Sequence, residues 1–406
     1  MRPCVLLSAF CMLTSAASAD SLNCRLVGTC ELPGHALDVA VRDHFAYVAA
    51  EDSGLRIIDV AEPQNPVEVG HFVPVCAWGV AIAGGVAYVA GYNDGLRIIN
   101  VADPQHPYEV GSCPVPAYAF RLVVVETLAY VVDQDSGLRI INVSDPQNPS
   151  EVGFFDTPNY SEGLAVAGAF AYVAGGDAGL RIIDVSDPEN PHEVGYYNTP
   201  HWAGGVAVAG TLAYVADGDS GLRVVDVRDP SSPFEVGRCE TPGNAGGVVV
   251  VGALAYVADV WGGLRVINVS DPRNPYEVGY HTASRYPSVE NVVVAGNLVY
   301  AAEGDDGLRI VEFLGGGVAE TPKPQVLSRT PQATVVRGVL VMPAANGEGR
   351  VANSACLHDA AGRRVMELQA GANDVRSLAP GVYFVRLRLE DALGVIETTR
   401  RWTIVR

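Results

Sequence analysis

Residues 221–237 read GLRVVDVRDPSSPFEVG, and close copies of this stretch occur seven times in the 406-residue chain. Successive Gly-Leu-Arg triplets are 41 to 44 residues apart. They begin at Gly54, Gly95, Gly137, Gly179, Gly221, Gly263 and Gly307. A period of about 40 to 50 residues with strand-like content is typical of propeller blades. The repeat therefore predicts an all-β fold, a β-propeller.

Each repeat divides into four short runs rich in Val, Ile and Tyr, separated by Gly, Asp and Pro. In one repeat these runs are residues 205–208, 212–216, 222–227 and 234–237. Such runs are typical of strands, and no repeat has room for a helix of about ten residues. We therefore expect four-stranded antiparallel blades.

The two ends of the repeat region complement each other. The seventh copy, residues 307–313, ends before the Asp-Pro turn and the Glu-Val-Gly strand. Residues 25–30 match residues 234–239 in register and supply the missing strand. An N-terminal strand that completes the last blade closes the ring and removes exposed sheet edges. We predict a seven-bladed propeller over residues 24–313.

The motif Leu-Arg-Ile-Ile-Asp-Val, as at residues 55–60, resembles the repeat of the LVIVD family of secreted bacterial β-propellers. The resemblance covers about residues 24–313. It implies an extracellular or cell-surface propeller and no established reaction.

A second resemblance follows a predicted linker at residues 314–332. Residues 359–365 (DAAGRRV) and 378–386 (LAPGVYFVR) are similar to signatures of the C-terminal sorting domain of type IX secretion. This resemblance implies that residues 333–406 form a small β-sandwich and that the secretion machinery is a partner. The Tyr-Pro-Asn-Pro opening usual in such domains is absent. A generic sandwich appended for stability is the alternative.

Residues 1–19 have the pattern of a secretory signal peptide. Arg2 precedes an apolar run at residues 5–13, and residues 17–19 form a small-x-small cleavage site. We therefore expect an exported protein, extracellular or on the outer cell surface. No later stretch approaches about 20 uninterrupted apolar residues, so no transmembrane segment is expected.

The formal net charge is −19, and it is unevenly distributed. Residues 331–406 hold ten Arg against seven acidic residues, which leaves −22 on the first 330 residues. A surface this acidic repels phosphate backbones, so nucleic acid is excluded as a partner.

Six cysteines follow the predicted signal peptide, at Cys24, Cys30, Cys76, Cys113, Cys239 and Cys356. Because disulfides form in exported proteins, Cys24 and Cys30 are candidates for a local disulfide. The chain contains no Cys-x-x-Cys motif. We therefore expect no metal site and no cofactor.

One loop position recurs where the last strand of a blade leads to the first strand of the next. It holds His35, Cys76, Tyr118, Tyr160, Trp202, Asn244 and Tyr286. Four of the seven are aromatic in a chain with 8% aromatic residues, and such rings combine an apolar face with a polar edge. Three residues further on, Asp38 and Arg121 stand where most blades have glycine.

These loops converge on the central channel, so we predict a mouth that binds a glycan or a protein loop. Its predicted residues are His35, Asp38, Tyr118, Arg121, Tyr160, Glu162, Trp202, Asn244 and Tyr286. The alternative is that the aromatic rings only cover the neighbouring blade and keep water from the inner strands.

The other repeated polar residues have structural interpretations. The Arg of Gly-Leu-Arg is the same in every blade, which favours pairing with an Asp or a carbonyl of the adjacent sheet. Acidic residues such as Asp133 and Asp217 precede the hairpins, where turn chemistry is favoured over calcium binding because the downstream Glu of a calcium loop is missing.

No linear catalytic motif is present: the chain has no Gly-x-Ser-x-Gly, no His-Glu-x-x-His and no phosphate loop. A binding propeller is therefore the first hypothesis. A glycan-acting or lyase-type enzyme using Asp38, Arg121 and Glu162 with a nearby His or Tyr is the second. A structural surface component without a discrete ligand is the third.

Overall fold

The computed structural model describes residues 21–73, 75–282 and 288–315 with their side chains, and Asp20 and the strands between residues 335 and 404 as backbone. The predicted signal peptide, residues 1–19, and Tyr286 lie outside the described residues. The chain divides into two compact units, residues 1–323 and 324–406. The described elements are all strands.

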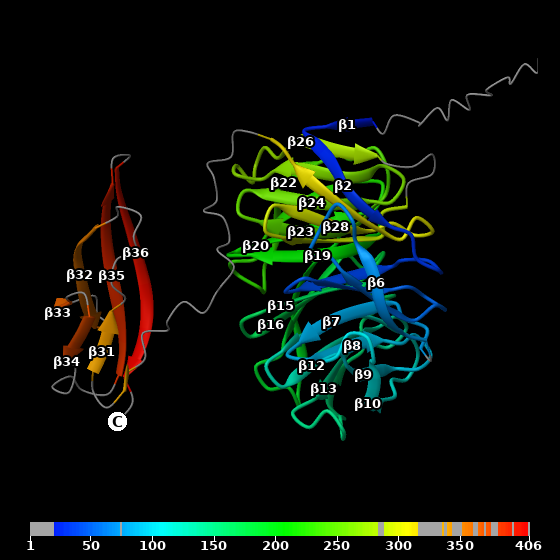
Figure 1. The fold of residues 1–406 in the computed structure, drawn as a ribbon, viewed down its shortest axis with the longest axis horizontal. Coiled ribbons are helices and arrows are strands. Elements are labelled where there is room, and N and C mark those ends of the chain that lie inside the picture. The colour runs from blue at the N-terminus through cyan, green and yellow to red at the C-terminus, as the bar shows by residue number, and fades with distance from the viewer. Residues whose placement is uncertain are drawn as a thin grey trace, which may run out of the picture. The chain divides into compact units, whose positions relative to one another are not determined.

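The first unit is a propeller of seven sheets, and its strands follow the repeat (Figure 1). The innermost strands of blades 1 to 7 are β3 (Asp38–Arg42), β7 (Gly79–Ala83), β11 (Ala119–Val125), β15 (Gly163–Ala167), β19 (Ala203–Ala209), β23 (Ala245–Val251) and β27 (Asn291–Ala295). The second strands are β4 (Phe45–Ala49), β8 (Val86–Ala90), β12 (Leu128–Asp133), β16 (Phe170–Ala174), β20 (Leu212–Asp217), β24 (Leu254–Asp259) and β28 (Leu298–Ala302).

The third strands begin at or next to the repeated glycine. They are β5 (Leu55–Asp59), β9 (Leu96–Asn100), β13 (Gly137–Asn142), β17 (Leu180–Asp184), β21 (Leu222–Asp226), β25 (Gly263–Asn268) and β29 (Leu308–Phe313). The outer strands of blades 1 to 6 are β6 (Val67–Phe72), β10 (Tyr108–Cys113), β14 (Ser150–Phe155), β18 (His192–Tyr197), β22 (Phe234–Cys239) and β26 (Tyr276–Thr282). The prediction of seven four-stranded blades is confirmed.

The ring closes through the N-terminal strand. β2 (Cys24–Cys30) pairs antiparallel with β29, with Arg25 opposite Glu312 and Cys30 opposite Leu308. In Figure 1 the blue β2 accordingly lies beside the yellow strands of blade 7. The strand predicted from residues 25–30 is therefore confirmed, and it joins the two ends of the repeat region.

A short strand ahead of β2 was not predicted. β1 (Asp20–Leu22) pairs with β26 and makes blade 6 a five-stranded sheet. Asn23 then turns the chain with a φ of +52°, and its side-chain amide donates to the carbonyl of Val278 at 2.7 Å. β1 thereby covers the outer edge of blade 6, next to the last blade.

The blades are apolar on both faces, because each sheet is covered by a neighbouring blade on either side. In blade 1, Val48, Leu55, Ile57 and Ile58 are all completely buried. The same positions are buried in the other blades. This explains why the second strand is apolar throughout, as in Phe-Ala-Tyr-Val-Ala, and why the third has two adjacent apolar residues and not an alternating pattern.

Two repeated glycines are required by the backbone. All seven glycines of Gly-Leu-Arg have φ between +71° and +83°, a region that favours glycine. The glycine of Glu-Val-Gly packs instead against the next blade: a Cβ at Gly70 would overlap the carbonyl oxygen of Pro104 in the Asp-Pro turn. At the closure, Gly28 meets Pro63 in the same way. The Glu-Val-Gly strand of one blade and the Asp-Pro turn of the next blade therefore form a contact between the two blades.

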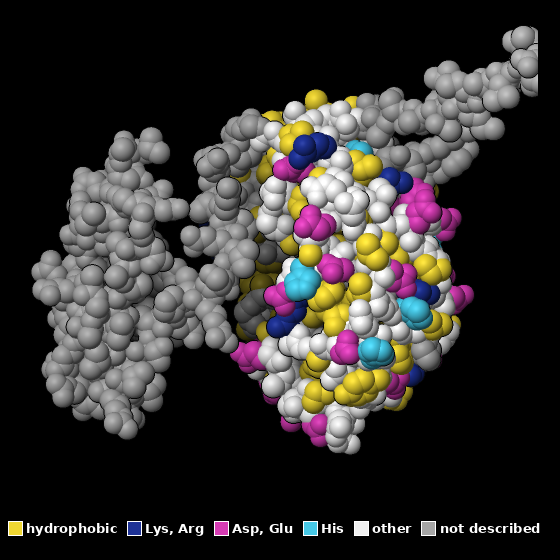
Figure 2. Space-filling view, viewed as in Figure 1, with side chains coloured by type: hydrophobic (Ala, Val, Ile, Leu, Met, Phe, Trp, Pro, Cys, Tyr) yellow, Lys and Arg dark blue, Asp and Glu magenta, His cyan; other side chains and the backbone are white. Residues whose placement is uncertain are grey.

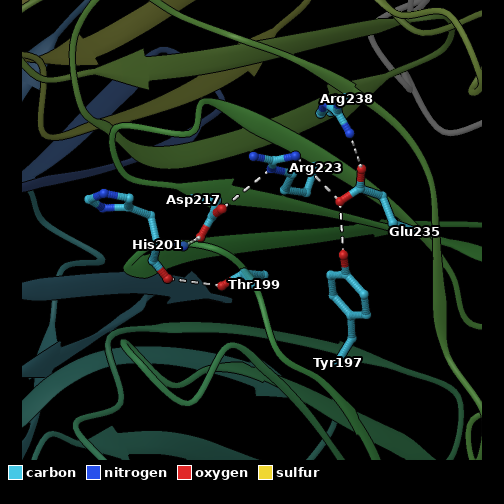
Figure 3. Close-up of polar contacts among 7 residues, drawn as sticks. All are labelled: Tyr197, Thr199, His201, Asp217, Arg223, Glu235 and Arg238. Atoms are coloured by element: carbon cyan, nitrogen blue, oxygen red, sulfur yellow. Dashed lines mark hydrogen bonds and ion pairs between the residues drawn. The ribbon is translucent and has the colours of Figure 1, made fainter.

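The repeated Arg pairs within its own blade. Arg223 lies 3.4 Å from Glu235 of the outer strand and 3.3 Å from Asp217, and the Tyr197 hydroxyl donates to Glu235 at 2.9 Å (Figure 3). Burial and the hydrogen bond to Glu235 raise the pKa of Tyr197 to about 12. Corresponding Arg–Glu pairs join Arg56 to Glu68, Arg97 to Glu109, Arg181 to Glu193 and Arg265 to Glu277.

Two expectations are corrected here. The repeated Arg pairs within its own blade and not with the adjacent sheet: in five blades its partner is the Glu of Glu-Val-Gly, twelve residues along the chain. The expected Asp partner is present for Arg139, Arg223 and Arg265. Cys24 and Cys30 do not form a disulfide, and both are free. They stand at opposite ends of the extended strand β2, and six steps of about 3.3 Å place them much farther apart than a disulfide spans.

The second unit contains two sheets. One has the order β30 (Val335–Val336), β31 (Val339–Met342), β34 (Gly371–Asp374). The other has the order β33 (Arg364–Leu368), β32 (Val351–Asp359), β35 (Gly381–Asp391), β36 (Gly394–Ile404). The residues of both sorting-domain signatures fall in or beside these strands, but their side chains lie outside the described residues. Among the described residues, no helix is long and apolar enough to cross a membrane.

Candidate functional site

The mouth of the propeller is formed by two sets of loops on one face. The hairpins before Gly-Leu-Arg bond to the loop that enters the next blade, as in the backbone bridges of Glu51 with Ala77 and Gly176 with Ala203. Each loop that carries a predicted mouth residue is therefore held against the hairpin of the preceding blade.

Buried carboxylates fix several of these loops. Asp133, completely buried, accepts from the backbone N–H groups of Ala117 and Tyr118 at 2.9 and 3.0 Å. Asp217 accepts from the N–H of His201 at 3.1 Å, as Figure 3 shows. The expectation that such Asp side chains bond their own turn is thus wrong for these two. Their carboxylates anchor the mouth loops of their own blades to the second strand.

Several predicted mouth residues cover a hairpin. A Cβ at Gly176 would lie 3.0 Å from the Trp202 indole, so this ring lies directly over that glycine. His35 lies over Gly304 in the same manner. Asn244 reaches the neighbouring hairpin too, where its amide donates to Asp219 at 3.0 Å. Small residues in the hairpin thus make room for the side chain of the next loop.

On blades 2 and 3 aromatic rings fill the mouth. The Tyr118 ring stacks on Tyr92 with centroids 4.5 Å apart, and Tyr92 stacks on Trp78 at 5.0 Å. Trp78 also contacts Phe120 at 4.9 Å. Aromatic contacts at these distances stabilise the packed state beyond the area they bury. We call these four residues the aromatic ladder.

Asp38 and Arg121 meet across the channel from blades 1 and 3. Arg121 Nη1 lies 3.0 Å from Asp38 Oδ1. Asp38 also accepts from the N–H groups of Val39 and Val80, at 2.8 and 2.9 Å, and from the Asn291 side chain at 2.5 Å. The intervening blade 2 has Gly79 at this position, where a Cβ would lie 2.7 Å from the backbone carbonyl oxygen of Phe120 in blade 3.

This network changes the role expected for Asp38. Asp38 accepts three hydrogen bonds, pairs with Arg121, and is 6% exposed. A general base needs a free lone pair within reach of the substrate proton. Buried and paired in this way, Asp38 is a positioning group for Arg121, and Glu162 is the remaining carboxylate of the enzyme hypothesis.

A cavity of about 290 Å³ is lined by residues of blades 3 to 7, including Phe120 of the aromatic ladder. We call it the off-centre cavity, because the described residues of blades 1 and 2 do not line it. Its lining includes Arg121, Glu162, Trp202 and Asn244, all predicted site residues. The remaining lining residues are Phe120, Gly204, Ala245, Gly246, Val260 and Glu290. The structure thus brings four of the nine predicted residues to one cavity.

The other predicted residues lie around it. Tyr118 belongs to the aromatic ladder. Tyr160 is 48% exposed and its ring centroid is 6.2 Å from that of Trp202. His35 Nε2 is 3.6 Å from Glu290, and its Nδ1 is 3.0 Å from Asp305. Tyr286 falls outside the described residues.

The cavity exists because one repeat position varies in size. The residue just before the first strand, or at its start, is Leu37, Trp78, Phe120, Glu162, Gly204, Gly246 and Glu290 in blades 1 to 7. Blades 2 and 3 fill the channel with rings, whereas blades 5 and 6 contribute no side chain. Glu162 and Glu290 stand on the two blades that flank this pair of glycines.

Sequence reasoning singled out Glu162 but missed Glu290. Both occupy the same repeat position, but two extra residues between residues 286 and 291 obscure the register of blade 7. The glycines were also missed, because a missing side chain was not considered as part of a site. Counting the position blade by blade would have found all of them.

The titration of the site groups follows from their surroundings. Burial raises the pKa of Glu162, against the Trp202 hydrogen bond and the Arg121 charge, which lower it. Burial lowers the pKa of His35, but its hydrogen bond to Asp305 and the charge of Glu290 outweigh this, so the net shift is upward. Among the described residues, no group of three or more His, Cys, Asp or Glu side chains is arranged to hold a metal ion.

The repeat is matched by a family model, the LVIVD repeat. It matches residues 33–73, 76–115, 116–157, 159–199, 202–241, 242–282 and 288–312. The chain belongs to the LVIVD-repeat family. The seven matched segments correspond to the seven blades of this LVIVD propeller.

Among solved structures, the LVIVD propeller resembles the crystal structure of the computationally designed Ika8 protein, with a TM-score of 0.54 and 8% sequence identity. The match covers 71% of this chain and 99% of that one. At this identity the similarity concerns the fold alone. No curated protein matches the chain.

Proposed function

We propose that this LVIVD propeller is an exported binding protein, extracellular or on the outer cell surface, that recognises its ligand in the off-centre cavity. The observation that carries the proposal is the break in repetition at the mouth. A ring of near-identical blades leaves one side open at Gly204 and Gly246 and lines it with Glu162, Glu290, Arg121 and Trp202. Binding sites are concave and carry a few well-placed polar groups, as this cavity does.

Two sequence features support export. The signal-like residues 1–19 precede β1 directly, so cleavage after Ala19 would leave Asp20 as the first residue of the first strand. The signatures at residues 359–365 and 378–386 support passage through a type IX secretion machinery.

Deletion of residues 333–406 is expected to retain the protein inside the outer membrane, as measured by surface proteolysis of cells.

The binding proposal is tested with a glycan array and a pull-down of surface proteins, using full-length protein. The decisive variant is Gly246→Leu, which places a side chain in the cavity. A Cβ at Gly246 meets its nearest atom, Val260 Cγ2, at 3.5 Å, an ordinary van der Waals distance. We expect the Gly246→Leu variant to lose binding to the glycan or surface protein that the wild-type protein retains. Unchanged retention by a folded Gly246→Leu variant would contradict a binding site in this cavity.

Carboxylate catalysis is a second candidate, favoured by the pair Glu162 and Glu290. Burial raises the pKa of Glu162, and two carboxyl groups in different environments are the usual basis of acid–base glycan chemistry. New reducing ends released from a glycan pool would support it, provided that Glu162→Gln and Glu290→Gln each abolish the release. Release that survives both substitutions would rule out this pair.

A further inference from the structure

The off-centre cavity is lined by two carboxylates, Glu162 and Glu290, and by a single Lys or Arg. Arg121 is the one Lys or Arg among its lining residues, and its guanidinium is engaged by Asp38, which is itself held by three further donors. The charge of Arg121 is therefore shared between Asp38, its ion-pair partner, and Glu162, whose pKa it lowers. Glu162 and Glu290 are left facing the cavity with the neutral donors Trp202 and Ser288 beside them.

His35 does not supply the missing charge in full. Its Nε2 lies 3.6 Å from Glu290, beyond hydrogen-bond distance, and its Nδ1 is 3.0 Å from Asp305. A protonated His35 would therefore be shared between two carboxylates. The local balance stays negative, as does the propeller as a whole. Figure 2 shows acidic side chains spread over the propeller face that is drawn, with basic ones in fewer places.

The shape and the walls favour an organic cation over a metal ion. The cavity of about 290 Å³ is near the lower end of small-molecule sites, which run from about 300 Å³ upward. Trp202 and Phe120 present aromatic rings in its wall, and such rings attract ammonium and guanidinium groups. The glycines at 204 and 246 leave space for an alkyl stem between the two carboxylates.

We infer that the cavity between Glu162 and Glu290 binds an organic cation, an ammonium or guanidinium group on an alkyl stem. This inference rests on the proposed function and names the ligand class of the same site. The group is either the side chain of a basic residue on a partner protein or a free alkyl amine. The two carboxylates hold its charge, and Trp202 covers its stem.

The experiment is calorimetric titration of full-length protein at low ionic strength. The probes are acetyl-Gly-Gly-Lys-Gly-Gly-amide, the same peptide with Nε-acetyl-lysine, and butane-1,4-diamine. We expect the lysine peptide or the diamine to bind and the acetylated peptide not to bind. The stronger of the two cations identifies the source. Binding should weaken with added salt, because the pairing is between charges.

Matched variants locate the site. Glu162→Gln and Glu290→Gln keep the shape of the side chains, and each should weaken cation binding about tenfold or more, the loss of one charge interaction of about 1.4 kcal/mol. Glu240→Gln is the control, because Glu240 is exposed on a mouth loop and does not line the cavity. It should bind as the wild type does. Gly246→Leu should abolish binding by filling the space.

Four outcomes would overturn the inference. Equal binding of the acetylated and unmodified peptides would show that charge is not recognised. Cation binding retained by both Gln variants would place the site elsewhere. If no cation binds but another ligand is retained by the wild type and lost in Gly246→Leu, the ligand class is wrong and the proposed binding site stands. If no binding of any kind depends on Gly246, the proposed function fails as well.

Discussion

The two sides of the propeller mouth are built from the same repeat position and reach opposite results. On blades 2 and 3 this position holds Trp78 and Phe120, which pack with Tyr92 and Tyr118 into the aromatic ladder. On blades 5 and 6 it holds Gly204 and Gly246, and a cavity opens between Glu162 and Glu290. A closed ring fixes the positions of all seven blades, so removing side chains on one side leaves a hollow that the fold does not close.

The difference assigns separate tasks to the two sides. The aromatic ladder stabilises the channel wall through its ring contacts. The cavity side has charged side chains around an empty space, an arrangement that side-chain packing alone does not favour. We therefore expect substitutions in the ladder to affect stability, and substitutions at the cavity to affect binding.

The largest effect should come from Trp78, and Trp202 is the matched comparison on the cavity side. Trp78→Ala removes a ring packed between Tyr92 and Phe120, and it should lower the free energy of unfolding by about 3 kcal/mol, the lower end for buried aromatics because Trp78 is partly exposed. Trp202→Ala should cost about 1 kcal/mol, because its nearest ring, Tyr160, is 6.2 Å away. Urea denaturation measures both. Equal losses would contradict the division between the two sides.

A buried carboxylate on blade 7 should show itself in the pH dependence of stability. Glu303 is 2% exposed, and burial raises its pKa from 4.5 to about 7, against the charge of Arg309, which lowers it. The equivalent residues of blades 1 and 2 are Ala50 and Gly91. The native state therefore keeps a proton that the unfolded chain releases between pH 4.5 and 7, so the stability contributed by Glu303 falls as the pH rises through this range.

Comparison with Glu303→Gln isolates this effect. The wild-type free energy of unfolding, minus that of the variant, should fall by about 2 to 3 kcal/mol between pH 4.5 and 8. Chemical denaturation at a series of pH values measures it. A difference that is constant with pH, or that grows as the pH rises, would contradict a raised pKa at this position.

The smallest effect concerns two glycines at the mouth. A Cβ at Gly79 would lie 2.7 Å from the carbonyl oxygen of Phe120, so Gly79→Ala should cost about 1 to 2 kcal/mol of stability. Gly246→Ala meets nothing closer than 3.5 Å and should change stability by less than about 0.5 kcal/mol. Thermal unfolding of both variants measures whether a side chain is tolerated at Gly246 of blade 6 but not at Gly79 of blade 2.

Most of the fold could be predicted because its determinants are local and repeated. The glycine of Gly-Leu-Arg needs a positive φ, and residues 25–30 match the outer strand that blade 7 lacks. β1 was missed because residues 20–22 match no repeat position and are recognisable only beside β26. The Glu partner of the repeated Arg was missed because the sequence does not show that Glu235 lies beside Arg223 across one strand pair, although the predicted Asp partner is present at Asp217.

The site was harder to predict than the fold. Asp38, Arg121, Glu162, Trp202 and Asn244 were placed correctly at the mouth, because the repeat register fixes the loop position. The ion pair between Asp38 and Arg121 depends on how far the Arg121 side chain reaches past blade 2 toward blade 1. That the cavity lies off-centre depends on which blades lack side chains. Neither the ion pair nor the position of the cavity can be predicted from the sequence of a single repeat.

The most direct test of an off-centre recognition cavity is a crystal structure of the full-length protein grown with butane-1,4-diamine. The ligand is expected between Glu162 and Glu290, over Gly204 and Gly246, with the aromatic ladder unchanged. Trp202 should lie along its alkyl stem. A mouth in which Trp202 and Phe120 meet across the channel and leave no space, or a diamine bound away from both carboxylates, would contradict the account.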